Sequence, residues 1–120
     1  MRNFKKLNVW QKSMALVVST YSLTKKLPDS EKYGLISQVN RCSVSIPSNI
    51  AEGSSRSTKK DYAHFLRMAI GSCFELETQA MIIEMLEFVE TDELSKIKSE
   101  IDEVQKMLFG LLKALNSSRS

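Results

Sequence analysis

The residues that could take part in chemistry are concentrated in the second half of the chain, where glutamates recur along one predicted helix. Glu75, Glu77, Glu84 and Glu87 lie within residues 59–88. Carboxylates on helices hold two metal ions in some four-helix bundles, but those sites also use Glu-x-x-His pairs. No Glu-x-x-His pair occurs in this chain. Its single histidine, His64, is interpreted as a structural residue. We therefore expect no metal and no cofactor.

Candidate nucleophiles are few. Ser72 and Glu75 lie about one helical turn apart, so an enzyme centred on them is one hypothesis, which predicts that both side chains face a water-filled pocket. Glycine-rich phosphate loops, a nucleophile elbow and zinc-binding cysteine pairs do not occur. Cys42 and Cys73 lie in apolar helical patterns and are predicted to be buried thiols, the alternative being a disulfide between them. We expect no catalysis.

A polar seam is the more informative pattern, because two otherwise apolar helices each carry one polar face. Its members are Arg41, Ser45, Asn49 and Glu52 on the first helix and Ser72, Glu75 and Gln79 on the second. A buried donor or acceptor without a partner costs about 1 to 3 kcal/mol, so such faces usually pack against each other. Since a short turn makes the two helices antiparallel neighbours, we expect an ion pair between Arg41 and Glu75 that sets their register.

Apolar periodicity predicts an all-α fold, an up-and-down antiparallel four-helix bundle that forms a single domain over residues 1–120. The helices are expected at about residues 9–27, 31–53, 59–88 and 92–115. Pro28 separates the first two helices, and Pro47 is expected to kink the second without ending it. Gly53 is expected to cap that helix, and Gly71 to let another helix approach closely.

Apolar stripes predict which helix faces are covered. In the first helix the stripe comprises Leu7, Trp10, Met14, Val17, Tyr21 and Thr24. The third helix carries two stripes, although one is enough for a bundle core. One of them comprises Tyr62, Phe65, Ala69, Leu76 and Ile83. The other could widen the intramolecular contact, but we favour a neighbouring subunit as its partner; it comprises Leu66, Ile70, Phe74, Met81, Met85 and Phe88.

Charge is unevenly distributed along the chain. Residues 1–60 contain eleven Lys or Arg and three Asp or Glu, a net charge of +8, whereas residues 61–120 contain six and eleven, a net charge of −5. Either the two halves attract each other within the bundle, or a basic surface is offered to phosphate groups. For the second alternative the candidate phosphate contacts are Lys5, Lys6, Lys12, Lys25, Lys26, Arg56, Lys59 and Lys60.

The N-terminal region does not predict export or membrane insertion. The segment MRNFKKLNVW contains basic residues but no continuous apolar region and no small-residue cleavage site. No apolar run approaches the roughly 18 residues that a membrane span needs. We expect a cytoplasmic protein that does not enter a membrane.

Six short motifs resemble one bacterial family, and the resemblance spans nearly the whole chain, about residues 4–115. They are VWQK at residues 9–12, YGL at 33–35, QVNR at 38–41, SIPSNIAEG at 45–53, AIGS at 69–72 and ELETQ at 75–79. The chain resembles the bacterial four helix bundle proteins, also named 23S rRNA-intervening sequence proteins. This resemblance implies a homopentamer of antiparallel bundles with no assigned reaction. A related branch, the accessory variability determinant of diversity-generating retroelements, is a basic pentamer that binds nucleic acid and a reverse transcriptase.

Two hypotheses for the function follow besides the enzyme. The first is a non-catalytic oligomer that binds RNA or DNA through its basic surface, with an affinity that falls as salt rises. The second is a protein-interaction scaffold or accessory subunit, for example for a reverse transcriptase, that does not itself bind nucleic acid. The scaffold predicts salt-insensitive binding through apolar surface.

Overall fold

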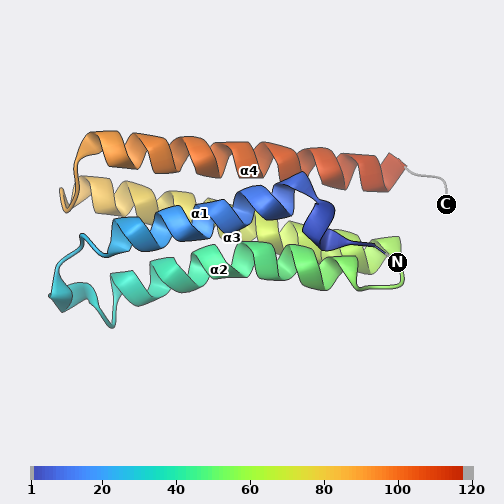
Figure 1. The fold of residues 1–120 in the computed structure, drawn as a ribbon, viewed down its shortest axis with the longest axis horizontal. Helices are drawn as coiled ribbons and strands as arrows, with labels where there is room; N and C mark the ends of the chain where they lie inside the picture. Colours follow the sequence, from blue (N-terminus) through green and yellow to red (C-terminus); the bar gives the residue numbers. More distant parts are fainter. Residues whose placement is uncertain (1, 118–120) are drawn as a thin grey trace.

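The computed structural model of the protein describes residues 2–117 and contains four α-helices and no β-strand in that part of the chain. The helices are α1 (Asn8–Thr24), α2 (Leu35–Ser54), α3 (Lys59–Met85) and α4 (Thr91–Ser117). Successive helices run in opposite directions (Figure 1), and α1 packs against α2 and α4 while α3 packs against the same two from the other side. The predicted antiparallel four-helix bundle is confirmed.

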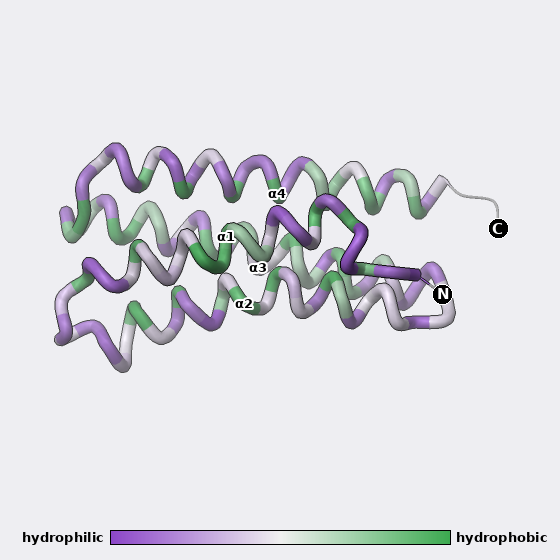
Figure 2. Tube along the Cα trace, in the orientation of Figure 1, coloured by the Kyte–Doolittle hydropathy of each residue, from purple (hydrophilic) through white to green (hydrophobic). Residues whose placement is uncertain are grey.

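The core follows from one apolar face on each helix. Along every helix, hydrophobic residues alternate with hydrophilic ones at the helical period (Figure 2). The largest side chains that are fully buried are Leu16, Ile46, Ile50, Leu66, Leu76, Ile83, Leu94, Ile101 and Leu108. The stripe of α4 is therefore the regular leucine and isoleucine pattern visible in the sequence.

The buried face of α1 differs from the predicted stripe. Met14 and Tyr21 are exposed, whereas Ser13 and Thr20 are buried beside Leu16. The hydroxyl of Ser13 donates to the Trp10 carbonyl at 2.7 Å, and that of Thr20 to the Leu16 carbonyl at 2.7 Å. Because these bonds satisfy the hydroxyls locally, the polar residues can lie in the core, and an apolar face is left outside.

Three predicted helix boundaries were wrong. The second helix begins at Leu35 instead of residue 31, because a short 3₁₀ turn, η2 (Asp29–Glu31), precedes Gly34, whose backbone is not helical at φ −108° and ψ −105°. The first and third helices end about three residues earlier than expected, at Thr24 and Met85. As predicted, α2 continues through Pro47, which is buried.

Gly53 lies inside α2 rather than capping it, and its lack of a side chain sets how closely α2 and α3 approach. A Cβ at this position would lie 2.8 Å from Phe65 Cβ and 3.3 Å from the Tyr62 carbonyl oxygen. Gly71, predicted to sit at a close helix contact, has no atom of another helix within 4 Å of such a Cβ. The close approach thus occurs at Gly53, and Gly71 lies on an open face.

Replacement of Gly53 by alanine is predicted to destabilise the fold. The new methyl group meets backbone and a fixed Cβ, so α2 and α3 must separate, at about 1 to 3 kcal/mol of unfolding free energy. Gly110→Ala is the matched control: that glycine is exposed in α4 with open space around it, and alanine there should stabilise by up to about 1 kcal/mol. Urea unfolding of both variants tests this, and equal effects would contradict it.

The turn between α3 and α4 places one non-glycine residue in the left-handed region. Glu87 has φ 59°, and its amide donates to the Glu84 carbonyl at 3.0 Å, while the Phe88 amide donates to the Ile83 carbonyl at 3.4 Å. This pattern ends α3 in the way that glycine usually ends a helix. A glutamate here is held at a conformation that L-residues disfavour.

Glu87→Gly should therefore raise the free energy of unfolding by about 0.5 to 1 kcal/mol. Glu87→Ala removes the same carboxylate but keeps a Cβ, so it separates the backbone effect from the loss of charge. Thermal unfolding of the two variants gives the comparison. If alanine stabilises as much as glycine, charge rather than backbone conformation explains the gain.

Candidate functional site

The polar seam joins α2 and α3 at their middle. The hydroxyls of Ser45 and Ser72 are hydrogen-bonded to each other at 2.7 Å, and the Cys42 thiol donates to the Ser72 carbonyl at 3.1 Å. On α2 itself, the Asn49 amide donates to the Ser45 carbonyl at 2.8 Å. The seam therefore connects the two helices through small side chains, and the half-buried Ser72 is hydrogen-bonded to α2 through both its hydroxyl and its carbonyl.

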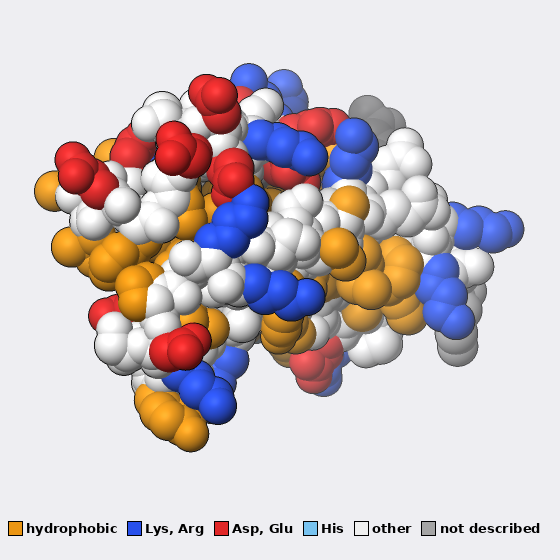
Figure 3. All heavy atoms as spheres, turned by 60° about the vertical axis from the view of Figure 1, so that its left-hand side comes forward, with side chains coloured by type: hydrophobic (Ala, Val, Ile, Leu, Met, Phe, Trp, Pro, Cys, Tyr) orange, Lys and Arg blue, Asp and Glu red, His pale blue; other side chains and the backbone are white. Residues whose placement is uncertain are grey.

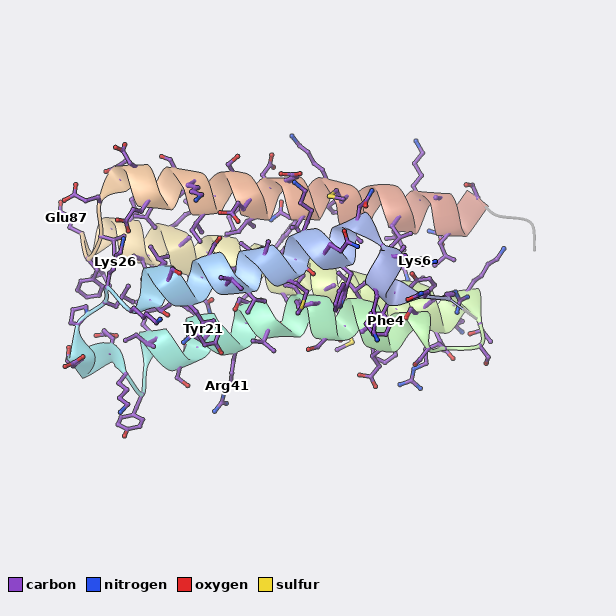
Figure 4. All side chains as sticks on the ribbon, viewed as in Figure 1. Phe4, Lys6, Tyr21, Lys26, Arg41 and Glu87 are labelled. Atoms are coloured by element: carbon purple, nitrogen blue, oxygen red, sulfur yellow. The ribbon has the colours of Figure 1, made fainter. Side chains whose placement is uncertain are left out.

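The predicted ion pair between Arg41 and Glu75 is not formed. Arg41 is exposed, and its side chain points away from the bundle (Figure 4). Glu75 accepts instead from the Gln79 amide at 3.2 Å, and Glu52 pairs with Arg56 at 3.0 Å along the same turn. A surface ion pair is worth about 1 kcal/mol or less, and solvation of the exposed guanidinium competes with it. The register of α2 against α3 therefore depends on the hydrogen bond between Ser45 and Ser72 instead.

Glu75, Glu77, Glu84 and Glu87 are not all brought to one place. Glu84 pairs with Lys98, Glu77 accepts from the Gln105 amide at 3.3 Å, and Glu87 lies in the turn after the helix. Within residues 2–117, no group of three His, Cys, Asp or Glu side chains is placed to hold a metal ion. Only Glu84 and Glu87 of these four line a common cavity. It lies at the α3–α4 turn, has a volume of about 530 Å³ and is also lined by Glu90, Glu93 and Lys26.

Cys42 and Cys73 are free, buried thiols on neighbouring helices, as predicted. Burial raises the pKa of Cys42 to about 12, with a smaller contribution from the Glu75 charge, and burial likewise raises the pKa of Cys73 to about 12. Both thiols are therefore protonated at neutral pH. A protonated thiol is a poor nucleophile, so the pair contributes packing rather than reactivity.

Because of these two buried thiols, we expect the free energy of unfolding to fall at alkaline pH. An unfolded thiol ionises near pH 9.0 and a folded one near pH 12, so the stability that both contribute is complete below pH 9 and is lost as pH rises toward 12. Urea unfolding from pH 8 to 11 should give a steeper loss for the wild-type protein than for Cys42→Ala/Cys73→Ala. Parallel pH profiles would contradict this assignment.

The structure divides the eight predicted phosphate contacts into groups. Lys12 binds Glu103 at 2.8 Å, and this hydrogen bond raises the pKa of Lys12. Lys26 pairs with Glu93, also on α4. These two lysines are therefore engaged within the bundle, as the intramolecular interpretation of the charge asymmetry predicts. Lys25 has no ion pair among the described residues, but it lies near Lys26, at the opposite end of the bundle from Lys6 (Figure 4).

The remaining predicted contacts gather where the N-terminal segment meets the turn between α2 and α3. We call this region the basic end; it comprises Arg2, Lys5, Lys6, Arg56, Lys59 and Lys60. The Arg2 guanidinium donates to the Arg56 carbonyl and lies 4.5 Å from the centre of the Tyr62 ring. Arg56 lies 4.7 Å from the centre of the Phe65 ring. The sequence analysis did not include Arg2 among the phosphate contacts, because its partners Arg56 and Tyr62 lie far from it in the sequence.

The opposite end of the bundle carries both signs of charge, with Lys26 beside an acidic cluster. Acidic side chains gather around the end that carries the α3–α4 turn (Figure 3). The molecule measures 49 × 24 × 20 Å, so the basic end and the acidic cluster at the α3–α4 turn are separated along its longest dimension. This separation exceeds the Debye length of about 8 Å at physiological salt, so each end acts on partners largely independently.

The predicted subunit interface is only partly available on the surface. Leu66 and Ile70 are buried in the core of their own protomer, so assigning them to a neighbouring subunit was wrong; Phe88 is half-buried. Phe74, Met81 and Met85 are exposed at 52, 51 and 80%. Residues of the second stripe near the start of α3 thus complete the core, while those further along face outward.

The sequence profile of one family matches most of the chain. The family is described as 23S rRNA-intervening sequence protein, and the match covers residues 5–110. The chain belongs to this family. The match includes the whole of α1, α2 and α3 and most of α4, which confirms the resemblance carried by the sequence motifs. The family description refers to an intervening sequence of ribosomal RNA and names no reaction.

A solved structure supports the fold of this family member. The chain is similar to a protein of unknown function from the S23 ribosomal protein family of Bacteroides thetaiotaomicron, with a TM-score of 0.81 and 24% identity over 88% of this chain and 95% of that one. At this identity the likeness concerns the fold. No curated protein matches the chain in sequence. No described helix is both long enough and apolar enough to cross a membrane.

Proposed function

We propose that this protein is a non-catalytic, self-associating bundle in the cytoplasm that binds RNA or DNA through its basic end. The observation that carries this proposal is the gathering of Arg2, Lys5, Lys6, Arg56, Lys59 and Lys60 at one end of the molecule, remote from the acidic α3–α4 turn. Residues 2–6 and 52–61 supply only Glu52 and Asp61 as carboxylates, so the local charge is strongly positive.

Phosphate is the chemistry that fits this end. Lys5, Lys6 and Lys60 are exposed and form no ion pair within the described part of the chain, so their ammonium groups are available to an anion. Thr58 caps α3 by accepting from the Asp61 amide at 3.1 Å, which leaves the positive end of the α3 dipole in the same region. Contacts of this kind hold the nucleic acid backbone without reading bases.

Self-association multiplies this weak contact. The exposed Phe74, Met81 and Met85 of α3 form the apolar surface on which another copy packs. Family resemblance favours a pentamer, in which five basic ends act on one nucleic acid molecule. Linked sites of modest affinity gain avidity in this way without any new contact.

A second candidate function is a protein scaffold, for example an accessory subunit of a reverse transcriptase. It is favoured by the aromatic pair of Phe74 and Phe109, whose ring centres lie 6.5 Å apart across α3 and α4 while both remain about half exposed. An adjoining groove, lined by Phe109, Leu112 and Lys113, has a volume of about 580 Å³. An apolar surface of this kind binds protein in a salt-insensitive way.

Charge reversal at each end tests the nucleic-acid proposal. Lys6→Glu/Lys60→Glu changes the basic end, and Lys32→Glu/Lys96→Glu makes the same change in net charge away from it. The first variant should lose on the order of tenfold or more in affinity for structured RNA or duplex DNA and show a shallower salt dependence. The control should bind like the wild-type protein.

Fluorescence binding across a salt series, with light scattering on the same samples, gives both affinity and subunit number. Wild-type protein that binds neither nucleic acid at low salt would contradict the proposal and favour the scaffold. Equal losses in both variants would also contradict it, because they would reflect net charge rather than the basic end.

A further inference from the structure

We propose that copies of this protein associate head to tail, with the outer face of α1 and α2 of one copy packed on the outer face of α3 of the next. This inference rests on the self-association proposed above and names the two surfaces that meet. The first face comprises Met14, Val18, Tyr21, Lys25, Arg41 and Val44. The second comprises Gly71, Phe74, Glu75, Thr78, Met81 and Met85.

The α3 face shows two features of a surface that another chain covers. Phe74, Met81 and Met85 follow one another at the helical spacing and are half exposed or more. Gly71 lies about one turn before Phe74 on an open side of the helix, where no contact within the bundle requires a glycine. A glycine in an exposed helix interior costs about 1 kcal/mol relative to alanine, so close approach of a second helix gives it a reason.

The α1–α2 face is a second apolar surface of similar kind. Val18 is 68% exposed, and Met14, Tyr21 and Val44 are exposed at 43, 42 and 40%. Val18, Tyr21 and Val44 line a shallow groove of about 330 Å³ that Lys25 borders. This surface exists because the hydroxyls of Ser13 and Thr20 take the inner side of α1, which turns its larger apolar residues outward.

The two faces lie on opposite sides of the bundle. Helix α1 packs against α2 and α4, and it makes no packing contact with α3, which lies diagonally across from it. The faces therefore cannot meet within one protomer. A contact between two different faces of identical subunits is heterologous, and it produces a closed ring or an open filament instead of a two-fold dimer.

Charge favours pairing the two faces with each other over pairing either with itself. Residues 8–24 and 35–51 contain no Asp or Glu, and the exposed Lys25 and Arg41 have no ion pair among the described residues. The α3 face carries the exposed carboxylate of Glu75 and, like the whole of residues 68–86, contains no Lys or Arg; Glu77 and Glu84 are bonded to Gln105 and Lys98 of α4 instead. Unlike faces thus bring cations to carboxylates, while like faces bring together charges of one sign.

Rotational symmetry then fixes where the basic ends lie. In a closed ring every copy has the same relation to the axis, so all basic ends occupy equivalent positions and all α3–α4 turns occupy another set. A nucleic acid bound to several copies at once therefore contacts one side of the assembly. The heterologous contact provides the geometry that the proposed avidity needs.

A mixing experiment distinguishes this arrangement from self-pairing of one face. Val18→Glu places a carboxylate in the α1–α2 face, and Met81→Glu places one in the α3 face. Each variant alone should be monomeric by light scattering, because one of its two faces is disrupted. An equimolar mixture should form 1:1 heterodimers of twice the monomer mass, because one intact junction remains. Tyr33→Glu, at a residue 90% exposed outside both faces, should assemble like the wild-type protein.

Circular dichroism and thermal unfolding verify that each variant is folded before mixing. Assembly of Val18→Glu to wild-type size while Met81→Glu is monomeric would show that α3 faces pair with each other, which overturns the inference and leaves self-association intact. A mixture that stays monomeric, or Met81→Glu that still assembles, would also overturn it. A wild-type protein that is monomeric would overturn the proposed self-association itself.

Discussion

The close approach of α2 and α3 is the constraint on which the rest of this structure depends. Gly53 lets the two backbones meet beside Phe65 and Tyr62, and the Ser45–Ser72 hydrogen bond joins the same helices further along. At Gly53 there is no space for a larger side chain, and at Ser45 and Ser72 the polar groups are paired with each other. The pair therefore has one register, and this register decides which residues of each helix face α1, α4 or solvent.

Electrostatics act at two levels in this bundle. Lys12 and Lys26 of the basic half meet Glu103 and Glu93 of α4, so part of the charge asymmetry along the chain is neutralised inside the protomer. The unpaired remainder lies at the ends and on the outer face of α1 and α2. Surface ion pairs of this kind contribute about 1 kcal/mol or less each, so their larger effect is on where partners can bind.

The outer surface of the bundle carries apolar residues on two of its helices. Exposed apolar side chains lie along the outer faces of both α1 and α3, and Gly71 on the outer α3 face has no other helix close to it. The α1 face arises from the buried hydroxyls of Ser13 and Thr20, whose bonds to their own helix make them acceptable in the core. Core composition and surface chemistry are thus coupled on a single helix.

By itself, the sequence determined the four helices, their antiparallel order, the stripe of α4 and the meeting of the α2 and α3 polar faces. These properties depend on periodicity and short turns, which are local. Only the tertiary structure decided that Arg41 faces solvent, that Leu66 and Ile70 belong to the core, that Lys12 and Lys26 pair with α4, and that Gly53 rather than Gly71 marks the close approach. Each of these depends on distance and rotation between helices, which non-local packing sets and periodicity does not encode.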